Sequence, residues 1–95
     1  MYGRLTRFQI KPEYLNELVA RLPQIRGLIS QIPRGVANYA FWNEDGSGVA
    51  IAVYEDEVAA EAASEQIAAI WGGLAPMLAG PPVMESYSSA ESMRT

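Results

Sequence analysis

The sequence predicts an α+β fold with elements in the order strand–helix–strand–strand–helix–strand. Three observations predict this order. Residues 2–10 and 83–88 alternate with a period of two, as strands do. Residues 13–32 and 57–73 carry apolar side chains at helical spacing. Between them, residues 36–56 form two strand-like stretches around an Asp-Gly dipeptide, which is a strong hairpin signal.

The first strand and first helix follow from this periodicity. Residues 2–10 place Thr6 and Phe8 on one face of a strand. The helix over residues 13–32 is predicted from apolar residues spaced alternately three and four positions apart, namely Leu15, Leu18, Leu22, Ile25, Ile29 and Ile32. Pro23 lies within this helix without changing the phase of the stripe, so we expect a kinked helix or two collinear pieces.

The hairpin is predicted with Asp45-Gly46 as a two-residue loop, because a type I′ turn needs positive φ at both central positions. On one face this register pairs Trp42 with Val49, Ala40 with Ile51 and Asn38 with Val53. On the other face it sets aromatic residues against alanines, pairing Phe41 with Ala50, Tyr39 with Ala52 and Ala37 with Tyr54. The glycine at position 48 could shift the pairing by one residue, which would exchange the faces.

The second helix is predicted from about residue 57 to 73, with Asp56 as its N-cap. Pro76 can begin a short new turn, and Pro81-Pro82 exclude further helix before the last strand. With right-handed crossovers this order gives a ferredoxin-like β-α-β-β-α-β domain over residues 1–95, with an antiparallel sheet and both helices on one face. If the face with Val49, Ile51, Val53 and Trp42 is the uncovered one, its apolar surface predicts a homodimer that packs sheet on sheet.

Composition excludes several classes of function. The chain has no cysteine and no histidine, which removes disulfides, thiolate nucleophiles, imidazole-based triads and the usual zinc and haem ligands. No acidic spacing is typical of a calcium loop, so we predict no metal site. The net charge of −4 argues against nucleic-acid or anionic-membrane partners. We see no signal peptide or membrane span and expect a cytoplasmic protein.

Three stretches resemble the antibiotic biosynthesis monooxygenase family of dimeric α/β barrels. They are RFQIKPEYLNELVARL, AVYEDEVAAEAA and LAPMLAGPPVMESYS. The resemblance implies a dimer through the sheet, with a substrate cleft between sheet and helices in each subunit. It also implies cofactor-independent oxygenation or haem degradation. The first-strand asparagine of haem-degrading members corresponds to Thr6 and their third-strand tryptophan to Tyr54, but their second-helix histidine has no counterpart, which argues against haem degradation.

The resemblance places a candidate site on one face of the sheet, under Trp71 of the second helix. The catalytic candidates are Tyr54, Tyr39, Thr6 and Arg4, and the substrate-binding candidates are Phe8, Phe41 and Trp71. An arginine can stabilise a developing enolate or phenolate, whereas a tyrosine base would need a pKa far below about 10. The neighbouring alanines either make room for a ligand or let the aromatic residues fill the core.

Two functions are consistent with the sequence. The first is a small-molecule-binding protein that acts as a cofactor-free monooxygenase on a small aromatic, polyketide- or quinol-type substrate. The alternative is a non-catalytic dimeric binding or stress-associated protein of the same fold with a filled cleft. An enzyme needs an open cleft with a polar group inside it, so the state of the cleft discriminates between them.

Overall fold

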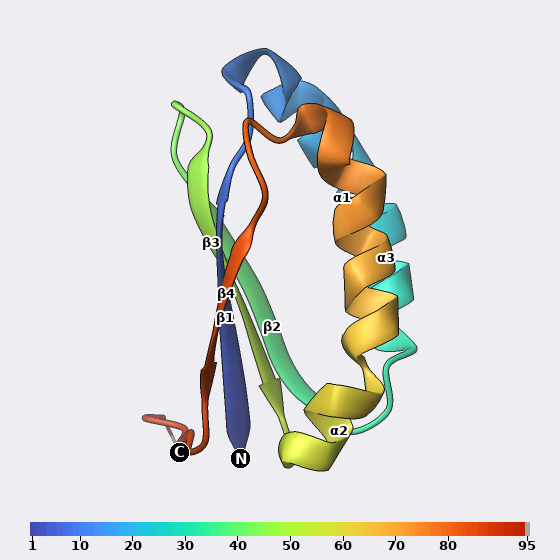
Figure 1. Ribbon diagram of the computed structural model, residues 1–95, viewed down its shortest axis with the longest axis vertical. Helices are drawn as coiled ribbons and strands as arrows, with labels where there is room; N and C mark the ends of the chain where they lie inside the picture. The colour runs from blue at the N-terminus through green and yellow to red at the C-terminus, as the bar shows by residue number, and fades with distance from the viewer. Residues whose placement is uncertain (95) are drawn as a thin grey trace.

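The computed structural model describes residues 1–94 as a four-stranded antiparallel sheet with helices on one of its faces (Figure 1). The strands are β1 (Tyr2–Gln9), β2 (Gly35–Trp42), β3 (Ser47–Tyr54) and β4 (Val83–Tyr87), in the spatial order β2-β3-β1-β4. The helices are α1 (Leu15–Ser30), α2 (Glu57–Ala62) and α3 (Ser64–Leu74), with 3₁₀ turns at Pro12–Tyr14 and Ala75–Met77. The predicted ferredoxin-like α+β fold is confirmed.

The helices differ from the prediction in detail. Pro23 lies inside α1, which is one helix over Leu15–Ser30 and is not divided into two pieces. The second predicted helix is instead divided at Ala63 into α2 and α3. Asp56 caps α2 as predicted, because its carboxylate accepts a hydrogen bond of 2.8 Å from the Ala59 amide. None of the helices in residues 1–94 has the length and apolar character needed to cross a membrane.

The β2–β3 register is shifted by one residue from the predicted register, so that prediction is wrong. The observed pairs are Trp42 with Gly48, Phe41 with Val49, Ala40 with Ala50, Tyr39 with Ile51 and Asn38 with Ala52. The reason is a loop of three residues, 44–46, in place of two. The Gly46 amide donates to the Asn43 carbonyl at 2.9 Å, and Gly46 has a φ of 87°. A turn followed by a left-handed glycine is the usual three-residue hairpin connection.

Two further contacts hold this loop. The carboxylate of Asp45 accepts hydrogen bonds from the Ser47 amide at 2.9 Å and the Ser47 hydroxyl at 2.6 Å. Gly46 lies against β1, where a Cβ atom would come within 1.9 Å of the Ile10 carbonyl oxygen. Only glycine fits this position, since it needs both the positive φ and the close approach.

The shifted register exchanges the two faces of β2. Because side chains alternate along a strand, Asn38, Ala40 and Trp42 face the helices, while Tyr39 and Phe41 face away from them. The exposed fractions of Tyr39 and Phe41 are 65% and 57%. The predicted placement of Tyr39 and Phe41 on the helix-covered face is therefore wrong, as is that of Asn38 and Trp42 on the opposite face.

The face of the sheet away from the helices is uncovered and largely apolar (Figure 1). The aliphatic residues of β3 lie on it as predicted, and Tyr39 and Phe41 join them. Further exposed apolar residues on β4 are Val83 and Tyr87. We refer to Tyr39, Phe41, Val49, Ile51, Val53, Val83 and Tyr87 as the outer apolar face.

The buried core consists of two clusters at opposite ends of β1. One contains Tyr2, Ile32, Tyr54, Ala59, Ala60 and Ala63. The other contains Ile10, Leu18, Leu74, Met77 and Leu78. Since Tyr2 and Ile10 stand at the two ends of β1, the clusters close the two ends of the layer between sheet and helices. The middle of that layer is where the candidate site lies.

Candidate functional site

A cavity of about 560 Å³ lies between the sheet and helices α1 and α3. Its floor is made of small side chains, Ala40 on β2 with Ala50 and Ala52 on β3. Its helical wall is apolar and consists of Leu18, Leu22, Ile25, Ile29, Ile67, Ile70, Trp71 and Leu74. A largely apolar hollow of this size is typical of sites for small molecules.

One end of the cavity is closed by two aromatic rings. Phe8 of β1 and Trp71 of α3 have ring centroids 5.6 Å apart and are tilted by 47°. Phe8 lies directly over Gly48, where a Cβ atom would come within 2.4 Å of the Phe8 ring. The missing side chain at Gly48 therefore lets Phe8 lie low on the sheet beside Trp71.

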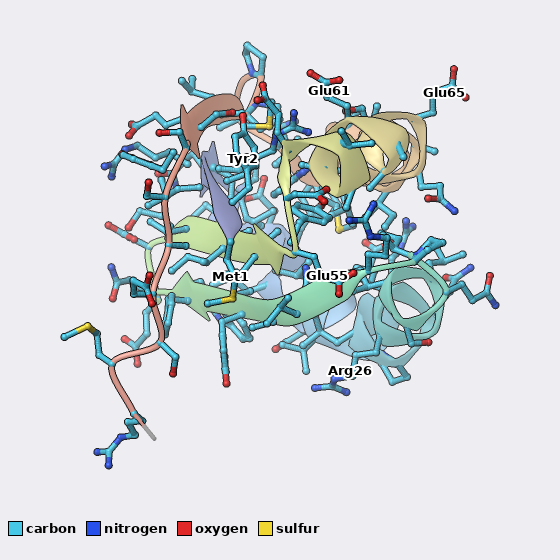
Figure 2. All side chains as sticks on the ribbon, turned by 90° about the horizontal axis from the view of Figure 1, so that it is seen from below. Met1, Tyr2, Arg26, Glu55, Glu61 and Glu65 are labelled. Atoms are coloured by element: carbon cyan, nitrogen blue, oxygen red, sulfur yellow. The ribbon has the colours of Figure 1, made fainter. Side chains whose placement is uncertain are left out.

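The cavity opens at the edge of the sheet. β2 is an edge strand, and Asn38, Ala40 and Trp42 on its inner face remain exposed. On the opposite side of the opening, α1 contributes Arg26 and Ser30 to the lining. Figure 2 shows Arg26 beside α1 at the periphery of the molecule. A ligand can therefore enter between β2 and α1.

Polar groups reach the cavity from three neighbouring strands. Arg4 of β1 and Asn38 of β2 both pair with Ala52 of β3, so they lie in one row across the sheet. Thr6 and Tyr54 also line the cavity and are buried, with exposed fractions of 8% and 2%. These four side chains give an otherwise apolar hollow one polar region.

The guanidinium of Arg4 is held by the junction of α2 and α3. Its Nη1 donates to the Ala60 carbonyl and to the Ser64 hydroxyl, both at 3.1 Å. The guanidinium also lies 5.6 Å from the centre of the Tyr2 ring. Its Nε is buried and has no hydrogen-bond partner. Arg4 is thus anchored at one nitrogen and unsatisfied at another.

Tyr54 is a hydrogen-bond donor at neutral pH. Burial raises the pKa of its hydroxyl above the ordinary value, and the nearby charge of Arg4 opposes this shift without reversing it. The hydroxyl therefore keeps its proton under physiological conditions. Tyr54 can stabilise an anion by donation but cannot act as a general base there.

The lining of the cavity contains six of the seven site residues predicted from sequence, which are Arg4, Thr6, Phe8, Tyr39, Tyr54 and Trp71. Tyr39 is among them although the register shift puts its side chain on the outer apolar face, where it is 65% exposed. The seventh, Phe41, also lies on the outer apolar face and lines a separate shallow hollow with Arg7.

Sequence reasoning missed three residues of the site, Arg26, Asn38 and Trp42. The alternation of side chains along β2 groups Asn38 with Trp42, but the two-residue loop predicted from the sequence assigns both to the face of the sheet away from the helices. Among residues 1–94, no three Asp, Glu, His or Cys side chains are grouped as a metal ion would require.

No protein-family model and no curated protein matches this chain. Solved structures do match it. An antibiotic biosynthesis monooxygenase superposes with a TM-score of 0.77 at 17% identity, covering 96% of this chain and 100% of its own. The chain has the same fold as this monooxygenase. The fold implied by the sequence resemblance is thereby confirmed.

Two further structures share this fold over almost the whole chain. SnoaB, a cofactor-independent oxygenase from Streptomyces nogalater, has a TM-score of 0.74 and 18% identity, covering 99% of this chain and 97% of its own. A protein of unknown function from Nitrosomonas europaea has a TM-score of 0.80 and 21% identity, covering 99% of this chain and 93% of its own. At such identities the likeness establishes the fold and leaves the reaction to be argued from the site.

We predict that Tyr54 titrates above the ordinary tyrosine pKa of about 10, because its buried phenolate is disfavoured. The folded state then binds this proton more tightly than the unfolded chain, so the free energy of unfolding should fall as the pH rises above about 10. NMR of ¹³C-labelled tyrosine rings measures the pKa, with Tyr54→Phe assigning the resonance. Arg4→Met should raise the pKa further, and titration of Tyr54 below 10 would refute its role as a neutral donor.

Proposed function

We propose that this chain binds a small aromatic molecule in the cavity and oxygenates it without a cofactor. The observation that carries the proposal is the open apolar cavity with Arg4, Thr6, Asn38 and Tyr54 gathered on its sheet side. The fold shared with SnoaB, described as a cofactor-independent oxygenase, supports the choice of reaction. The substrate would be a phenol, quinol or aromatic polyketide.

The walls suit a flat ring system. The floor consists of small alanine side chains, and the facing helices supply Ile25, Ile29 and Ile70 together with the indole of Trp71. An aromatic ligand between these layers would bury its faces against apolar side chains. Its polar end would then lie toward Arg4 and Tyr54.

The reaction would begin with loss of a proton from the activated phenol or enol of the substrate. The electron-rich carbon of the anion then forms a bond to O₂, which is reduced to a carbon-bound peroxide and takes up a proton from water. Arg4 and the protonated Tyr54 would stabilise the anion by charge-assisted and neutral hydrogen bonds, which lowers the substrate's own pKa. The chain would thus contribute orientation and anion stabilisation, with the proton leaving to water at the opening.

The alternative of a non-catalytic binding or stress-associated protein rests on a filled cleft. The volume of about 560 Å³ between sheet and helices does not favour that alternative.

We further propose that two copies associate through the outer apolar face. Tyr39, Phe41 and Val83 have exposed fractions between 57% and 65%, which is unusual for large apolar side chains that share one face. Burial of this face against a second copy would remove it from water and leave the cavities on the outside of the dimer.

Tyr54→Phe is expected to lower kcat/KM for oxygen consumption by about 10- to 100-fold, because one donor to the developing anion is lost. The assay uses an oxygen electrode with a panel of hydroxyanthrones and quinols. Tyr14→Phe is the matched control, since Tyr14 belongs to the 3₁₀ turn before α1 and lies neither in the lining of the cavity nor on the outer apolar face. Unchanged turnover in Tyr54→Phe would exclude the proposed role, and absence of turnover with every substrate would count against oxygenation itself.

Ile51→Asp is expected to convert the dimer into a monomer, because it places a charge at the centre of the outer apolar face. Light scattering coupled to size exclusion measures the mass. Val58→Asp on α2 is the control, since Val58 is 66% exposed away from the sheet and should leave the mass unchanged. A monomeric unaltered chain, or a dimeric Ile51→Asp variant, would overturn the proposed assembly.

A further inference from the structure

The cavity carries positive charge in an acidic protein. Its lining includes Arg4 and Arg26 and no acidic residue, although the chain as a whole has a net charge of −4. Arg7, Arg21 and Arg34 each form a salt bridge with a carboxylate on the surface. Within residues 1–94, Arg4 forms no such pair. A cation that is partly buried without a counter-ion is costly, and a bound anion would compensate it.

The geometry of Arg4 leaves one nitrogen of its guanidinium available. Of its three nitrogens, only Nη1 donates a hydrogen bond within residues 1–94. The Nε is closed to water and has no acceptor from the protein, so a ligand oxygen cannot reach it either. Nη2 has no acceptor within residues 1–94 and is not closed to water. It is therefore the donor that Arg4 can offer to a ligand.

The α2–α3 junction explains why Nη2 stays free. α2 ends at Ala62, so the Ala60 carbonyl lies in its last turn. This carbonyl accepts from Nη1 of Arg4, at the end of the helix where a cation is favoured, and from the Ser64 hydroxyl. Ser64, the first residue of α3, accepts from the same Nη1. These contacts hold the guanidinium at Nη1 and leave Nη2 without a partner within residues 1–94.

We propose that the ligand of this cavity is an aromatic molecule that is already an anion when it binds, and that Nη2 of Arg4 binds its charged end. The proposal rests on the proposed function and narrows its substrate class. Aromatic carboxylates and ionised hydroxyquinones are anions of this kind. Arg26, at the opening, adds attraction for such an anion as it enters.

The test compares charged and neutral aromatic probes on the unaltered protein, under anaerobic conditions, by calorimetry and tryptophan fluorescence. One pair is 2-naphthoate and 2-naphthamide, and the other is 2-hydroxy-1,4-naphthoquinone, ionised at neutral pH, and its methyl ether. We expect the anion of at least one pair to bind about tenfold more tightly or better, as a charge-assisted hydrogen bond would give. The pair that shows the preference identifies the oxygen chemistry. Equal affinities within both pairs would overturn the proposal.

Variants then assign the preference to Arg4. Arg4→Met should abolish it, while Arg7→Met, which removes an arginine of the same strand from the opposite face, should preserve it. Circular dichroism checks that each variant is folded. If Arg4→Met does not fold, Arg4→Lys keeps the charge, but its single nitrogen cannot occupy both the Nη1 and the Nη2 positions, so it should lose several-fold in affinity for the preferred anion. A full preference retained in a folded Arg4→Met, or in Arg4→Lys, would contradict the assignment.

Because binding is measured without oxygen, the anion preference and the proposed oxygenation can be refuted independently of each other. Anion preference without oxygen consumption by any substrate would support the inference and count against oxygenation. Oxygen consumption with equal binding of charged and neutral probes would support oxygenation and refute the inference.

Discussion

The cavity depends on a glycine that does not line it. Gly46 has a φ of 87° and approaches β1 so closely that a Cβ atom would lie 1.9 Å from the Ile10 carbonyl oxygen. This contact, together with the Ile10 amide that donates to the Gly46 carbonyl at 2.8 Å, holds a three-residue loop at the tip of the β2–β3 hairpin. The loop sets the register in which Ala40 lies opposite Ala50. A shift of one residue would turn Tyr39 and Phe41 toward the helices, where their rings would occupy the space.

The same arrangement separates two kinds of apolar surface. The inner face of the sheet has small residues at its centre and larger clusters at its ends, so sheet and helices are held apart over the middle. The outer face carries the large aromatic and aliphatic side chains. The sheet thus leaves room for the cavity on one face and carries the exposed apolar area on the other.

Most polar groups of the cavity lie on its sheet side. The polar groups belong to β1, β2 and the end of β3, and the only charges in the lining within residues 1–94 are those of Arg4 and Arg26. Arg4 has no carboxylate partner within residues 1–94, and its Nη2 has no acceptor there. An anionic ligand would supply both the charge and the acceptor on binding. Burial keeps Tyr54 protonated, so it adds a second donor to the same region without competing for the positive charge.

The sequence correctly predicted the side-chain faces that follow from local periodicity. It did not predict the faces of β2, because a contact between residues far apart in the sequence determines the hairpin register. Thr6, Phe8, Tyr54 and Trp71 were placed on the correct face because their strands and helix keep one phase throughout. The faces of β2 were exchanged because Asp45-Gly46 is compatible with loops of two or three residues, and the contact of Gly46 with Ile10 selects the longer loop.

The break at Ala63 could not be predicted either, since no glycine or proline marks it in the sequence. The Ala60 carbonyl there accepts from the Ser64 hydroxyl and from Arg4, a residue 56 positions away along the chain. Contacts of this kind arise only once the sheet and helices have come together. The size of the cavity likewise depends on how closely the two layers approach, which no local pattern specifies.

The most direct test of the central claim is a high-resolution crystal structure of the purified protein. We expect an open cavity between the sheet and helices α1 and α3, with ordered density for a carried-over ligand, or for water, within hydrogen-bond distance of Nη2 of Arg4. If Phe8, Trp71 and the isoleucines of α1 fill the space between sheet and helices, with no cavity over Ala50 and Ala52, the account is contradicted. Any function would then lie on the outer surface of the protein.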